Sequence, residues 1–76
     1  MITNEANITN NERSYREFNE LVKTYVPGYD ATSISIKKTS RGNYKLIDAE
    51  GRCRHLVSKF LLNDELIETY NLKTIE

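Results

Sequence analysis

The spacing of the apolar residues changes at Pro27-Gly28, and this change constrains the fold more than any other feature of the sequence. Thr9 and Glu12 have the spacing of a capping box at the start of a helix. Pro27 ends that helix, because proline has no N–H to donate and its ring clashes with the preceding turn. Between these points apolar residues recur three and four positions apart, which predicts one apolar stripe on an amphipathic helix: Tyr15, Phe18, Leu21, Val22, Tyr25 and Val26.

After the proline, apolar and polar residues alternate, which is the pattern of strands with one buried face. Ile34 and Ile36 point inward in a strand over 32–38, and Tyr44 and Leu46 point inward in a strand over 43–48. The residues between the strands favour a turn, in which Gly42 is free to adopt a positive φ. A loop of three or five residues places all four side chains on one face, whereas a loop of four places them on opposite faces.

Residues 52–58 fit either a strand or the start of a helix that runs to residue 70. The strand points Cys53, His55 and Val57 inward, and we favour it for two reasons. A hairpin-like turn over 48–51 precedes the segment, and Asn63, followed by two acids, has the pattern of a new helix start. A short helix over 64–70 then follows. The competing helix would present one apolar stripe of Cys53, Leu56, Val57, Phe60 and Leu61.

These elements predict an α+β fold, with an N-terminal helix packed on a three-stranded antiparallel sheet and a short C-terminal helix (order α-β-β-β-α). The alternative is α-β-β-α, with residues 52–70 helical. We expect a flexible tail over 1–8 and a single small domain over 9–76. Leu72 and Ile75 pack as a tail or as a short edge strand. The expected core is Phe18, Leu21, Val22, Tyr25, Ile34, Ile36, Leu46, Val57, Phe60, Ile67 and Tyr70.

Charge is segregated along the chain, although the formal net charge is zero. Residues 37–59 contain seven basic and two acidic residues, a net charge of +5. Residues 1–30 carry −2, from five acids and three bases, and residues 60–76 carry −3, from four acids and one base. Such a pattern bears on binding partners rather than on the fold.

The three-stranded arrangement gives the basic residues a geometry. Pairing Leu46 with Cys53 places Lys45 opposite Arg54 and Ile47 opposite Arg52. Lys37 shares the outer face of the sheet with Lys45. Like charges that face each other are mildly destabilising, which is easier to understand if the face meets anions. The candidate nucleic-acid-binding residues are Lys37, Lys45, Arg52 and Arg54 on this face, with Arg41 at the tip of the first hairpin.

Three short antiparallel strands followed by a helix, with basic residues on the sheet, are loosely similar in architecture to the arm-binding domains of tyrosine recombinases. The similarity covers about half of the chain. It implies a sheet face that enters the major groove of DNA.

The basic residues are not accompanied by a catalytic, metal or phosphate-loop motif. Cys53 lies between two arginines, which favour a thiolate, yet it falls on the apolar stripe in both structures and we interpret it as packing. His55 is the single histidine, too few ligands for zinc, and we expect it at a sheet edge or beside the basic residues. The acids of residues 64–68 have the spacing of a capped helix. We therefore expect no enzymatic activity, no metal and no cofactor.

We interpret the chain as a small non-enzymatic regulatory protein that binds DNA or RNA through a basic sheet face and hairpin. The alternative is an inhibitor or accessory factor of the phage or mobile-element type, which binds an acidic or nucleic-acid-binding host protein. The abundance of Asn, Ile, Lys and Tyr is typical of AT-rich genomes, as in many phages. Short apolar runs, an N-terminus without basic residues and a single cysteine predict a cytoplasmic protein that is not inserted in a membrane.

Overall fold

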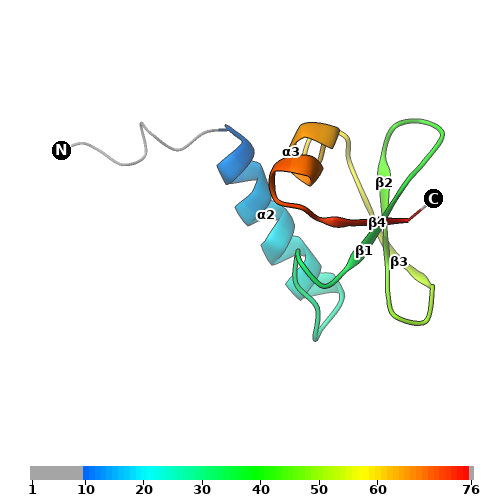
Figure 1. Ribbon diagram of the computed structural model, residues 1–76. Coiled ribbons are helices and arrows are strands. Elements are labelled where there is room, and N and C mark those ends of the chain that lie inside the picture. Colours follow the sequence, from blue (N-terminus) through cyan, green and yellow to red (C-terminus); the bar gives the residue numbers. More distant parts are fainter. Residues whose placement is uncertain (1–9, 76) are drawn as a thin grey trace.

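The computed structural model describes residues 10–75, so the expected tail over 1–8 and the Thr9 cap lie outside the described residues (Figure 1). Two helices and four strands make up this part of the chain. Their order is α2 (Asn10–Tyr25), β1 (Ser35–Lys38), β2 (Tyr44–Ile47), β3 (Cys53–Val57), α3 (Asp64–Thr69) and β4 (Lys73–Ile75). The α+β fold is confirmed, and residues 53–57 form a strand rather than the alternative helix.

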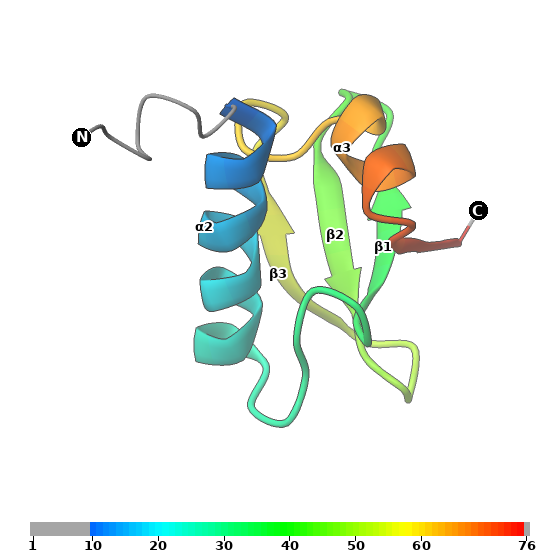
Figure 2. The ribbon, with the colours of Figure 1, turned by 60° about the vertical axis from the view of Figure 1, so that its left-hand side comes forward.

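The strands form one mixed sheet in the order β3-β2-β1-β4. β1, β2 and β3 pair antiparallel, as expected, and β4 adds a fourth strand parallel to β1. Of the two outcomes expected for residues 72–75, the structure shows the edge strand. Both helices lie on the same side of the sheet, with α2 beside β3 and α3 beside β1 (Figures 1 and 2). No element of residues 10–75 covers the other side of the sheet.

The core lies between the sheet and the two helices. Six residues of the expected core are buried there, and Leu21, Ile67 and Tyr70 pack against it while partly exposed. The prediction that Tyr25 and Phe60 belong to the core is wrong, because these residues are 51% and 89% exposed. The fully enclosed members of the core are Phe18, Val22, Val26, Ala31, Ile34, Ile36, Leu46, Val57, Leu62 and Leu66.

Two aromatic pairs attach α2 to the rest of the fold. Near its start, Tyr15 stacks on Tyr70, which follows α3, with ring centroids 4.0 Å apart. At its end, Tyr25 stacks on His55 of β3, again at 4.0 Å. The second pair explains why Tyr25 is half exposed. Its ring packs on His55 of β3, which is an edge strand of the sheet, and not in the core. Offset or parallel stacking of this kind adds to the area that the rings bury.

The hairpin from β1 to β2 has a five-residue loop, one of the two lengths that place Ile36 and Leu46 on the same face. Thr39 N donates to Asn43 O at 2.8 Å, and Gly42 N donates to Thr39 O at 3.0 Å. Gly42 has a φ of 88°, which explains why the loop needs glycine at this position. The Thr39 hydroxyl accepts from Arg41 N and Asn43 N, so four of the five backbone N–H groups of the loop donate a hydrogen bond within it.

Candidate nucleic-acid interface

The side of the sheet opposite the helices, called the open face, consists of two rows of side chains. Alternation along the strands assigns them, because Ile36, Tyr44, Leu46 and Val57 are buried on the helix side. Cross-strand pairing then aligns Leu56, Lys45, Lys37 and Ile75 in one row, and Cys53, Ile47, Ser35 and Lys73 in the next. All eight are at least partly exposed except Ile47, and none of the eight is acidic.

Lys37 and Lys45 lie directly opposite each other at the centre of the open face. The sequence predicted that they share this face, and the structure brings them together. Side chains that face each other across two strands have Cβ atoms about 5 Å apart. Among residues 10–75, neither lysine forms an ion pair. Two lysines are therefore paired across the sheet, and no carboxylate of residues 10–75 forms an ion pair with either.

Arg54 is not part of this pair, which corrects the expected register. Lys45 lies opposite Leu56 rather than Arg54, and Ile47 lies opposite Cys53 rather than Arg52. Leu46 pairs with His55, so the chain inserts one extra residue, Arg54, as a β-bulge. The bulge also explains why Cys53, expected to point inward, is exposed.

The bulge directs the Arg54 guanidinium to a buried carboxylate. Its Nη1 lies 3.2 Å from Oδ2 of Asp48, whose side chain is only 1% exposed. The other oxygen of Asp48 accepts backbone N–H groups of Glu50 and Arg52, both at 2.9 Å. These donors, the Arg52 N–H foremost and then the Arg54 guanidinium, hold the pKa of Asp48 below its ordinary value despite burial. Arg54 thus serves the turn between β2 and β3.

Arg41 and Arg52 lie at opposite ends of the sheet. Arg41 is in the loop after β1, and Arg52 is in the turn before β3 (Figure 2). A strand of four residues is about 13 Å long, so one compact patch of all five candidates does not form. The structure brings Lys37 and Lys45 together, leaves one arginine at each end, and assigns the fifth candidate to an internal ion pair.

Two further lysines, Lys73 and Lys59, lie on or near the open face and its β1–β2 loop, and the sequence prediction did not include them. Lys73 of β4 is aligned with Ser35 on the open face. Lys59, just after β3, donates its N–H to Asn43 Oδ1 at 3.1 Å and so lies beside the β1–β2 loop. The alternation of Leu72 with Lys73 was the available signal for the first. The second lay in the basic segment but outside the predicted strand.

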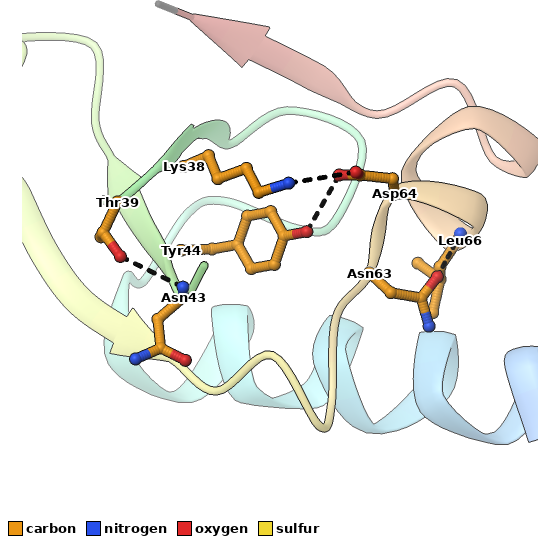
Figure 3. A network of polar contacts seen from close by, with 7 residues as sticks. All are labelled: Lys38, Thr39, Asn43, Tyr44, Asn63, Asp64 and Leu66. Carbon is orange, nitrogen blue, oxygen red and sulfur yellow. Dashed lines mark hydrogen bonds and ion pairs between the residues drawn. The ribbon is translucent and has the colours of Figure 1, made fainter. Parts of the chain in front are cut away.

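On the helix side, a polar network neutralises the remaining lysine of β1 (Figure 3). Asp64, the first residue of α3, accepts from Lys38 Nζ and from the Tyr44 hydroxyl, each at 3.1 Å. Lys38 and then Tyr44 lower the pKa of Asp64. Burial, and then the adjacent carboxylate, raise the pKa of Tyr44 to about 12. A hollow of about 470 Å³ next to this network is lined by residues of α3, of β1 and β4, and by Tyr44 of β2.

The described residues offer no metal site, because no three His, Cys, Asp or Glu side chains come together within 10–75. Cys53 and His55 have different surroundings. The thiol lies on the open face, and the imidazole is stacked on Tyr25. In the same range, no helix is both long and apolar enough to cross a membrane.

Comparison with known proteins gives no relative for this chain. No protein family, curated protein or solved structure matches it.

Proposed function

We propose that this chain is a small non-enzymatic regulator that binds nucleic acid, DNA or RNA, through the open face and the β1–β2 loop. One observation carries the proposal: Lys37 and Lys45 face each other on a sheet surface that, within residues 10–75, no other element covers and whose eight positions include no acidic residue. The proposal places the protein in the cytoplasm, where reducing conditions keep the exposed Cys53 a thiol.

Electrostatics supports an anionic partner. Two lysines directly opposite each other destabilise a sheet by about 0.2–1 kcal/mol, and a small domain has little stability to lose. Phosphates placed between the ammonium groups remove that repulsion and release counterions from the nucleic acid. Lys73 and Arg41 extend the cationic surface, whereas Arg54 is held by Asp48 and contributes less than its sequence position indicated.

Binding should be measured with duplex DNA, single-stranded DNA and RNA at several salt concentrations. Each phosphate contact adds about 0.7–0.9 to the slope of log K against log salt. The double variant Lys37→Glu/Lys45→Glu should bind at least ~10-fold more weakly and lose about two contacts from that slope. The matched control, Arg13→Glu/Lys23→Glu, makes the same change of charge on exposed positions of α2 and should bind more strongly than the open-face variant.

The single cysteine provides an independent footprint. Cys53 is exposed and lies on the open face opposite Ile47. Saturating nucleic acid should therefore slow the reaction of its thiol with a maleimide. Absence of binding to all three nucleic acids at ~50 mM salt, where phosphate contacts are strong, contradicts the proposal.

A second candidate function is that of a protein-binding inhibitor or accessory factor, of the phage or mobile-element type, acting on a host protein. This function is favoured by the two ends of the open-face row that contains Lys37 and Lys45. At these ends Leu56 is 60% and Ile75 is 42% exposed. Apolar anchors beside lysines suit a partner surface that is partly apolar and acidic. Capture of one host protein that is lost with Leu56→Ser, together with no binding to nucleic acid, would favour this function.

A further inference from the structure

Phe60 is the most exposed large apolar side chain of residues 10–75, at 89%, and its exposure is fixed by the backbone. It lies in a turn directly after β3. Phe60 N donates to Ser58 Oγ at 3.0 Å, and Leu61 N and Leu62 N donate to Ser58 O at 3.0 and 3.1 Å. Leu62 is fully buried and anchors the end of the turn. The ring is therefore presented to solvent by a hydrogen-bonded turn.

The turn that carries Phe60 is attached to the β1–β2 loop. Lys59 N donates to the Asn43 side chain, and a Cβ added to Gly42 would lie 3.9 Å from Cδ of Lys59. Both segments lie at the same end of the sheet (Figure 2). Lys59 Nζ is 5.8 Å from the centroid of the Phe60 ring. The ring thus has one cation over it and a loop containing Arg41 beside its turn.

The charge around Phe60 determines which kind of partner it suits. The loop over 39–43 and the turn over 58–62, which lie at this end of the sheet, contain no acidic residue, and the nearby Asp64 is paired with Lys38. An aromatic ring among cations is the arrangement with which proteins hold unpaired nucleotides, because a base stacks on the ring while the cations contact phosphates. A purely apolar partner would leave Lys59 and Arg41 without counter-charges.

We propose that Phe60 is a base-stacking residue for single-stranded nucleic acid, with Lys59 and Arg41 contacting the flanking phosphates. This inference rests on the proposed function. The strand positions of the open face carry no aromatic side chain, so they offer phosphate contacts but no stacking. Phe60 supplies the stacking surface at the end of that face. A duplex keeps its bases stacked on one another and cannot use the ring in this way.

The test compares a single-stranded oligonucleotide with the duplex of the same sequence. Phe60→Ala should weaken binding of the single strand about 5- to 100-fold and binding of the duplex less than about 2-fold. Phe60→Trp should retain or increase the affinity for the single strand. Phe60→Leu is the matched control, because it keeps an apolar side chain but removes the aromatic ring, and it should behave like the alanine variant. Folding is not at risk, since the side chain is exposed.

The outcomes separate this inference from the function on which it rests. Equal binding by Phe60→Ala and the unaltered protein overturns the stacking role, while loss of binding in Lys37→Glu/Lys45→Glu would still support the open face. Full binding by Phe60→Leu also overturns it, because the side chain would then act only as an apolar anchor. Absence of binding to any nucleic acid overturns both.

Discussion

At the scale of single residues, Asp48 links stability to pH. Its carboxylate is buried, accepts two backbone N–H groups and forms an ion pair with Arg54. Its pKa is lowered in the folded protein, the Arg52 N–H being the largest cause. A lowered folded pKa means that the charged form stabilises the fold above the unfolded value of about 3.9. That contribution is lost as the pH falls through the lower folded pKa.

We predict that Asp48→Asn is less stable than the unaltered protein at neutral pH and that the difference shrinks in acid. The amide can still accept the backbone N–H groups, but it cannot pair with the Arg54 guanidinium. Urea unfolding measured between about pH 7 and pH 2 should show a shallower acid decline for the variant. Arg54→Gln removes the ion pair but keeps the carboxylate and its two backbone donors, so its stability should still decline more steeply in acid than that of Asp48→Asn. Equal stability of Asp48→Asn and the unaltered protein at neutral pH would contradict this role.

Residues also show how far the candidate site could be predicted. Alternation alone placed Lys37 and Lys45 on the outer face, and the odd loop length kept them together. Arg54 could not be placed in this way, because a β-bulge ends the alternation and nothing local in the sequence marks it. Phe60 belongs to an apolar run of three, of which Leu62 is buried, Leu61 is partly exposed and Phe60 is exposed. The hydrogen-bonded turn that begins at Ser58 determines which of the three side chains is buried.

At the scale of elements, α3 depends on its N-cap. Asn63 has extended backbone angles and its Oδ1 accepts from Leu66 N at 2.8 Å (Figure 3). A helix of six residues has almost no stability of its own, so it relies on this bond and on the burial of Leu66. We predict that Asn63→Ala lowers the free energy of unfolding by about 1 kcal/mol, within 0.5–2.

The Asn63→Asp variant is the matched control, because aspartate is an equally good N-cap and its charge suits the helix dipole. Thermal unfolding should give a midpoint about 4–8 °C lower for the alanine variant and little change for the aspartate variant. If the alanine variant melts with the unaltered protein, the cap does not stabilise α3.

The elements that could be predicted are those with local signals. α2 follows from its apolar stripe and its proline, and β1 and β2 follow from alternation around a turn. β4 was open from the sequence, because its pairing with β1 is parallel and joins residues about forty positions apart. β4 depends on its pairing with β1 and on the residue before it, because Leu72 is buried in the core while the three residues of β4 are exposed. Only three residues pair, too few for a periodic signal.

At the scale of the whole molecule, the fold converts segregation along the chain into segregation by side. The helix side carries both signs, because α2 has three acidic and three basic residues and Asp64 of α3 neutralises Lys38, while the eight positions of the open face hold three lysines and no acid. The net charge of zero therefore does not describe the open face, which is cationic. Stability and binding should then oppose each other at the open face, because the repulsion that weakens the sheet is what attracts phosphate.

We predict that Lys45→Glu is more stable than the unaltered protein and binds nucleic acid less well. The change turns a like-charge pair with Lys37 into an opposite-charge pair, which should add about 0.2–1 kcal/mol to the free energy of unfolding. Because salt screens both effects, raising it from ~0.05 to ~0.5 M should stabilise the unaltered protein relative to the variant. Lys45→Gln removes the repulsion without adding attraction and should lie between them. A destabilised Lys45→Glu, or salt responses of equal size, would show that Lys37 and Lys45 do not interact, and would remove the energetic support for an anionic partner.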